Sequence, residues 1–156
     1  MREKVIAMNK LVAYYSASGV TARAANALAS EVGADVYEIV PAEKYTDADL
    51  DWTNRKSRST LEMRDPSSRP ELAEKSTDLT QYDTVYIGFP IWWGVAPRVI
   101  NTFIENNDLS GKKIGIFATS GGSGIGAAVK DLQNKYPELD IRGGKLLNGS
   151  VKGDIL

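Results

Sequence analysis

The sequence predicts an α/β fold in which a parallel sheet carries helices on both faces. Short apolar runs alternate along the chain with stretches whose apolar residues recur at helical spacing. This alternation is typical of strand–helix–strand units, whose strands pair in parallel. A glycine- or serine-bearing loop follows three of the apolar runs. Because the carboxyl ends of parallel strands meet at one edge of the sheet, we expect a single ligand site there.

Five strands and three helices are predicted from these patterns. The strands are expected at residues 11–15, 35–40, 84–89, 113–118 and 141–147. The first helix follows the first loop and stops at Gly33, and Pro97 opens the second. Apolar residues from Ile125 to Tyr136 predict the third. The predicted strands and helices are explained by packing, so the loops between them are the parts of the chain that indicate its chemistry.

Two regions depart from this simple alternation. Residues 42–81 show no clean period, although Asp47–Trp52 could begin a helix, and a loop of that length usually has its own structure or function. Val151–Leu156 is too short to be the helix that should cover the fifth strand. We therefore expect the last helix to be missing and one apolar face to be uncovered, with either self-association into a homo-oligomer or marginal stability as the result.

Composition indicates one domain, residues 1–156, and excludes several kinds of chemistry. The chain has no cysteine and no histidine, which excludes disulfides, iron–sulfur ligation, a Ser-His-Asp triad and His-ligated zinc. No apolar run is long enough for a membrane span, the start lacks a secretory apolar core, and the net charge of −1 argues against nucleic acid. We expect a cytoplasmic protein with no metal, whose redox chemistry would come from a bound organic cofactor.

The first loop has the donors that a phosphate needs. Ser16, Ser18 and Thr21 offer hydroxyls, and Gly19 permits a turn that points successive N–H groups inward. The following helix adds its positive end. The alternative is an ordinary strand-to-helix turn with Thr21 as its N-cap.

The second and third loops suit a planar ring. The segment Pro90–Gly94 contains Trp92 and Trp93, which can stack on a flat ligand, although one of them can instead pack in the core. The segment Thr119–Gly126 offers backbone N–H groups for a polar ring edge. Its glycine spacing also resembles a dinucleotide fingerprint, but that turn belongs after a first strand. Together the three loops fit flavin mononucleotide (FMN) best.

With these loops placed, the chain resembles a flavodoxin, and within that family the bacterial subgroup with Pro-Ile-Trp-Trp and Thr-Ser-Gly-Gly-Ser-Gly loops. The resemblance runs from about Leu11 to Ser150 and implies a five-stranded sheet of order 2-1-3-4-5. It implies that the FMN phosphate is bound by Ser16, Ser18, Gly19, Val20 and Thr21. It implies that the isoalloxazine is flanked by Pro90, Ile91, Trp92, Trp93 and Gly94, and that its pyrimidine edge meets Thr119, Ser120, Gly121, Gly122 and Gly124.

The resemblance implies electron transfer through the bound flavin, with a redox partner protein or a small-molecule acceptor and no catalytic side chain. Val20 stands where electron carriers usually have Asn, and the charge of −1 is far from their strong acidity. The alternative is an FMN-dependent NAD(P)H oxidoreductase acting on quinones or similar acceptors. Residues 51–69 would then be a lid whose cations meet an anionic substrate; the candidates are Arg55, Lys56, Arg58 and Arg64. A third interpretation is a domain that keeps the fold but holds no flavin.

Overall fold

The strands form one parallel sheet with a switch in strand order at its centre. The computed structural model describes residues 9–120, 122–148, 151 and 153–156. Its strands are β1 (Lys10–Tyr14), β2 (Asp35–Glu38), β3 (Thr84–Pro90), β4 (Lys113–Thr119) and β5 (Asp140–Leu146). They pair in parallel in the order β2-β1-β3-β4-β5. The predicted fold class and strand order are confirmed.

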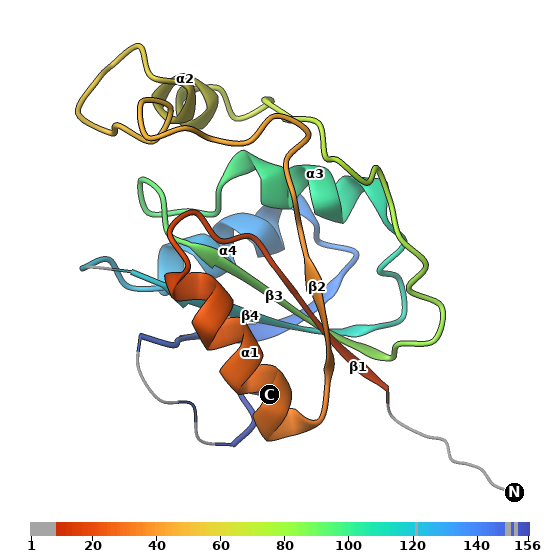
Figure 1. The fold of residues 1–156 in the computed structure, drawn as a ribbon. Coiled ribbons are helices and arrows are strands. Elements are labelled where there is room, and N and C mark those ends of the chain that lie inside the picture. The colour runs from red at the N-terminus through yellow and green to blue at the C-terminus, as the bar shows by residue number, and fades with distance from the viewer. Residues whose placement is uncertain (1–8, 121, 149–150, 152) are drawn as a thin grey trace, which may run out of the picture.

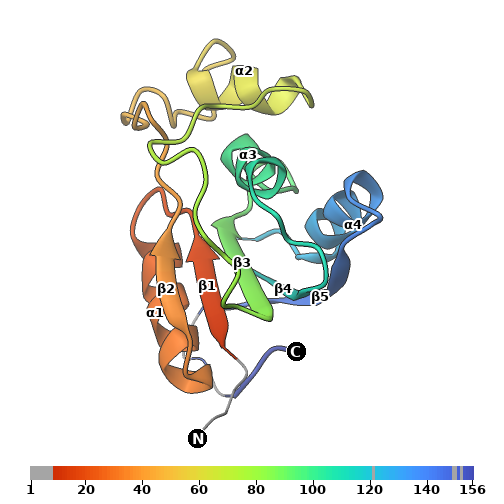
Figure 2. The same cartoon turned by 90° about the vertical axis from the view of Figure 1, so that its right-hand side faces the viewer.

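Helices cover both faces of this sheet, as Figures 1 and 2 show. The helices are α1 (Val20–Val32), α2 (Arg58–Arg64), α3 (Arg98–Asn106) and α4 (Gly126–Lys135). Helix α1 covers one face and α3 and α4 the other, with an apolar cluster under each layer. The central strands β3 and β4 are buried almost along their whole length, which explains their near-continuous apolar sequence.

Local signals in the sequence set the helix ends. Gly33 caps the C-terminus of α1 in the left-handed conformation that glycine adopts easily, and Pro97 is the N-cap of α3. Both predicted boundaries are confirmed. Gly88 has a different role, because an added Cβ would lie 1.9 Å from the ring of Phe117 on the neighbouring strand. Glycine there allows the phenyl ring to lie directly over β3.

The middle segment, residues 41–83, leaves the sheet and returns to it. Its two ends pair at an antiparallel bridge between Pro41 and Leu72, with Ala42 N donating to Glu71 O at 2.8 Å. The short helix α2 lies within this excursion, beyond the edge of the sheet toward which β1 and β2 point in Figure 2. Residues 47–50 form turns, so the helix expected to begin at Asp47 lies instead at Arg58–Arg64.

The chain after β5 contains no helix in its described residues, but it does not leave the α1 face of the sheet bare. Leu147 is buried, and Val151 and Ile155 pack against the cluster under α1. Asp154 accepts a hydrogen bond from the Tyr86 hydroxyl at 2.7 Å. The expectation of an uncovered apolar face is therefore wrong for the α1 side of the sheet, because Leu147, Val151 and Ile155 pack there.

None of the helices in the described part of the chain has the length and apolar character that crossing a membrane requires.

Candidate functional site

The three predicted loops lie side by side at the carboxyl edge of the sheet. They follow β1, β3 and β4, which are neighbours in the strand order. Backbone hydrogen bonds continue the ladder into the loops: Tyr15 N donates to Gly88 O and Ile91 N to Thr119 O, both at 3.0 Å. The edge where the loops meet is also the switch point of the sheet, between β1 and β3, where parallel α/β sheets bind their ligands.

The first loop turns sharply into α1 and leaves several donors free. Gly19 is the N-cap with φ 94°, so the alternative interpretation of Thr21 as the N-cap is wrong. The Ser16 hydroxyl accepts from Gly19 N at 3.0 Å and Ala22 N at 3.1 Å, which fixes the turn. Among the described residues, nothing bonds the Ser18 hydroxyl or the N–H groups of Val20 and Thr21. These donors lie at the positive end of a 13-residue helix.

Thr21 links the first loop to the third. Its side chain is buried, and its hydroxyl lies 2.7 Å from the hydroxyl of Thr119 at the end of β4. One of the two hydroxyls donates to the other, so the pair keeps one proton that a ligand can accept. Sequence reasoning assigned these residues to opposite ends of the ligand, whereas the structure places them in contact.

The second loop is a tight two-residue turn. Trp92 N donates to Val95 O at 2.9 Å, and Val95 N donates to Trp92 O at 3.1 Å. Between them Trp93 has φ 49° and Gly94 φ 84°, the pattern of a type I′ turn. A bulky residue rarely adopts a positive φ, yet Trp93 does so with its side chain 51% exposed. Backbone strain of this kind is concentrated at functional sites.

The two adjacent tryptophans have different environments. Trp92 is partly buried and packs edge-on against Tyr15 and Tyr45, with ring centroids 5.8 Å and 5.4 Å away. The interpretation that one tryptophan packs in the core therefore holds for Trp92. Trp93 is the indole left available to a ligand.

The third loop turns around Ser120. Its hydroxyl accepts from Gly122 N at 3.2 Å and Ser123 N at 2.8 Å, while Ser120 N donates to the side chain of Asn148. Gly124 is exposed, and an added Cβ at Gly122 or Gly124 would meet nothing within 4 Å. Gly121 lies outside the described residues. The loop therefore presents an open backbone surface beside the first two loops.

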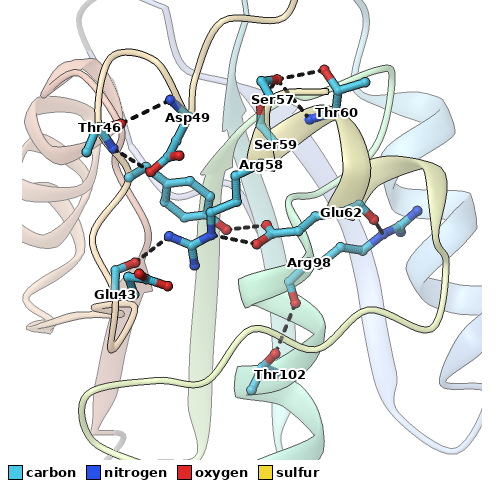
Figure 3. A network of polar contacts seen from close by, with 11 residues as sticks. Glu43, Thr46, Asp49, Ser57, Arg58, Ser59, Thr60, Glu62, Arg98 and Thr102 are labelled. Atoms are coloured by element: carbon cyan, nitrogen blue, oxygen red, sulfur yellow. Dashed lines mark hydrogen bonds and ion pairs between the residues drawn. The ribbon is translucent and has the colours of Figure 1, made fainter. Parts of the chain in front are cut away.

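A polar network holds α2 over this edge (Figure 3). Arg58 Nε donates to Glu62 at 2.8 Å, Arg58 Nη1 donates to the Glu43 carbonyl at 2.6 Å, and the guanidinium lies 3.9 Å from the centre of the Tyr45 ring. The Tyr45 hydroxyl donates to the same Glu62 carboxylate. Burial, and then the contact with Glu62, raise the pKa of Tyr45, so its phenol stays protonated. Arg58, one of the four predicted lid cations, is thus already paired, whereas Arg55, Lys56 and Arg64 are exposed.

Arg98 is a residue whose role sequence reasoning missed. Its side chain is buried at the start of α3, and it donates to the carbonyls of Met63 at 2.8 Å and Glu62 at 3.3 Å. Burial lowers the pKa of Arg98, but the group remains charged. It satisfies carbonyls in the last turn of α2 and so ties the middle segment to α3.

Trp52 was not predicted as a site residue either. It lies on the middle segment and lines a pocket of about 410 Å³ together with five other residues: Leu50, Ser59, Ile91, Trp92 and Trp93. The only sequence signal for Trp52 was that a large hydrophobic residue stands in a stretch without clean periodicity. The pocket joins the middle segment to the second loop.

The residues at this edge fit a phosphate joined to a planar ring. The unpaired hydroxyl and N–H donors at the start of α1 suit a phosphate dianion, and no carboxylate lies between Tyr15 and Ala22. The exposed indole of Trp93 offers a flat wall, and the loop after β4 offers backbone N–H groups. These are the groups with which proteins hold FMN-sized ligands at a sheet edge.

Comparisons with known proteins agree with this geometry. The family model described as flavodoxin matches residues 9–156. A crystal structure of a candidate flavoprotein from Bacteroides uniformis shares 55% identity over 93% of each chain, with a TM-score of 0.91. One from Bacteroides eggerthii shares 54% identity over 90% of this chain and 89% of that one, with a TM-score of 0.89.

A more distant structure carries the cofactor. It is a flavoprotein from Lactobacillus acidophilus in complex with FMN, with 25% identity over 91% of this chain and 95% of that one and a TM-score of 0.75. A search of curated proteins gives no match to the chain.

Proposed function

The chain belongs to the flavodoxin family, and on that premise we propose that it binds FMN and transfers electrons through the bound flavin. The observation that carries the proposal is the set of unpaired donors at the start of α1: the Ser18 hydroxyl and the N–H groups of Val20 and Thr21. A phosphate dianion would satisfy these donors together. The FMN complex of the Lactobacillus acidophilus protein supports the choice of cofactor.

In this proposal, FMN supplies the redox chemistry and the chain holds and orients it. Ser18, Val20 and Thr21 bind the phosphate, and Gly19 allows the turn. Ser16 fixes the turn by accepting from Gly19 N and Ala22 N, and its own hydroxyl proton remains available to the phosphate. The isoalloxazine is flanked by the Pro90–Gly94 turn, and its pyrimidine edge faces the loop that begins at Thr119.

The proposal includes a redox partner, either a protein or a small acceptor, and a cytoplasmic location.

Electron transfer is tested by loading the protein with FMN, reducing it with dithionite, removing the excess dithionite and adding oxidised cytochrome c as a generic acceptor. We expect cytochrome c to be reduced in proportion to the bound FMN. Reduced, FMN-loaded protein that leaves cytochrome c oxidised would contradict the proposal.

The second candidate is an FMN-dependent NAD(P)H oxidoreductase that reduces quinones or similar acceptors. The apolar pocket beside Trp93 favours it, because a protein that passes electrons only to proteins does not need such a pocket. Arg58 counts against it, because this lid cation is already paired with Glu62 and the carbonyl of Glu43. Mixing the FMN-loaded protein with NADPH, without an acceptor, distinguishes the two candidates. The bound flavin of a carrier is reduced slowly by NADPH, whereas the bound flavin of an oxidoreductase is reduced as fast as the enzyme turns over.

A further inference from the structure

The pocket that contains Trp52 is built from two segments far apart in the sequence. The middle segment supplies Leu50, Trp52 and Ser59, and the turn after β3 supplies Ile91, Trp92 and Trp93. No charged side chain lines it among the described residues, and its volume of about 410 Å³ lies within the range of small-molecule sites. A ligand that suits such a lining is aromatic and uncharged.

Two of its lining residues are indoles that the fold leaves exposed to solvent. Trp52 is 74% exposed, and Trp93 is 51% exposed on a left-handed backbone. Hydrogen bonds donated by backbone N–H groups near Trp52 fix the position of its loop without burying the ring. Thr53 N donates to Asp51 Oδ1 at 3.0 Å, and Ser59 N donates to Asp49 O at 3.0 Å. Two large apolar rings kept exposed around one pocket indicate a surface that a ligand covers.

The pocket also contains a buried hydroxyl without a good partner. Ser59 is 2% exposed, and among the described residues its hydroxyl has only a 3.5 Å contact with Ser57 Oγ. Thr60 Oγ1 donates to Asn54 O, so in the 2.9 Å contact between Thr60 and Ser57 it is Ser57 that donates. The Ser59 proton is therefore left with a long bond and can turn to a closer acceptor.

We propose that this pocket binds a planar, uncharged aromatic carbonyl compound between Trp52 and Trp93, with Ser59 donating to the carbonyl oxygen. Ile91, Trp92 and Trp93 also belong to the Pro90–Gly94 turn of the proposed flavin site, so the ligand would lie directly against the flavin. Its role as an electron acceptor rests on the proposed function, but its binding does not. The site would make a small molecule, rather than only a protein, a partner of this chain.

The test is equilibrium dialysis of menadione (2-methyl-1,4-naphthoquinone) against the protein, with and without bound FMN. The chain has no cysteine, so the quinone cannot arylate a thiol. We expect binding to both forms and a loss of at least about tenfold in affinity for Trp52→Ala. Leu61→Ala is the matched control, because Leu61 is an exposed apolar residue of α2 outside the pocket lining, and it should leave affinity unchanged.

The hydrogen bond is tested with a second ligand that lacks the carbonyls, 2-methylnaphthalene. Ser59→Ala should weaken menadione about two- to tenfold and leave 2-methylnaphthalene unchanged. Equal losses for both ligands would overturn the assignment of Ser59.

Three results would overturn the pocket itself: no binding of menadione, equal effects of Trp52→Ala and Leu61→Ala, or competition between menadione and FMN. Competition would show that the flavin takes this pocket. Because the Trp52 side chain is largely in solvent, Trp52→Ala should fold, which circular dichroism verifies. If FMN fails to bind, the proposed function is wrong. The pocket inference is then decided only by whether menadione binds to the flavin-free protein.

Discussion

Trp93 and Gly94 occupy the two left-handed positions of the turn after β3, and only one of them is glycine. The type I′ turn usually takes Asn-Gly, so a tryptophan at its first central position is an exception to ordinary turn chemistry. The sequence predicted that Trp92 and Trp93 mark a site, but a residue pair alone does not reveal the turn type. The turn separates their roles, because it sends Trp92 toward Tyr15 and Tyr45 and leaves Trp93 exposed.

At this scale, Gly94→Ala tests the turn. An added Cβ at Gly94 would meet nothing within 4 Å, so the cost comes only from the positive φ. We expect the free energy of unfolding to fall by about 1–2 kcal/mol. Gly122→Ala is the control, because that position is equally open and its φ is not left-handed. Urea unfolding of both variants measures the difference; equal stability would mean that the turn accepts another conformation.

At the scale of elements, the middle segment is the part of the fold that sequence patterns described least well. Helices α1, α3 and α4 follow local signals such as Gly33 and Pro97, so their positions were predictable. Helix α2 depends on contacts distant in sequence: Arg98 donates to Met63 O, 35 residues away, and the guanidinium of Arg58 lies over the Tyr45 ring. A pattern read residue by residue contains no sign of such pairings.

Arg98→Ala should release α2 from α3. It leaves the carbonyls of Glu62 and Met63 without their charged donor, and each such bond contributes about 1.5–3 kcal/mol. We expect faster amide hydrogen exchange across residues 57–65 and little change in β3 and β4. Arg55→Ala, at an exposed arginine of the same segment, should change neither. Unaltered exchange in Arg98→Ala would show that the Tyr45, Arg58 and Glu62 contacts suffice to hold α2.

The tail after β5 should lose its attachment in acid. Burial raises the pKa of Asp154, but hydrogen bonds from the Tyr86 hydroxyl, Leu156 N and Lys10 outweigh it and leave the pKa below its usual value. A lowered folded-state pKa gives stability that is complete above the unfolded value of about 3.9 and is lost as pH falls through the folded value.

Asp154→Asn isolates this contribution. The variant should be less stable than the wild type at pH 6, and the difference should shrink as the pH falls below about 4. The urea midpoints of both proteins between pH 3 and pH 6 measure it. A difference that stays constant over this range would mean that Asp154 does not hold the tail through its charge.

At the scale of the whole molecule, the alternation of apolar runs and helical patterns was enough to predict the sheet, and the sheet brought the three loops together. Sequence reasoning failed where the chain packs without regular structure. Val151, Asp154 and Ile155 lie outside any helix, yet Val151 and Ile155 pack against the face predicted to be bare and Asp154 bonds Tyr86 there. The ground for expecting self-association through that face is gone, and a homo-oligomer remains a proposal for sedimentation velocity to test.

The central claim, that the start of α1 holds a phosphate, concerns how the whole site is arranged around its ligand. Calorimetric titration of FMN and riboflavin into the flavin-free wild type tests it most directly, since the two ligands differ only in the phosphate. Each charge-assisted bond contributes about 1.5–3 kcal/mol, so we expect FMN to bind at least about a hundredfold more tightly. Ser18→Ala should reduce that ratio about tenfold or more, and Ser30→Ala, at an exposed serine of the same helix, should not. Equal affinities of the wild type for FMN and riboflavin would contradict the account.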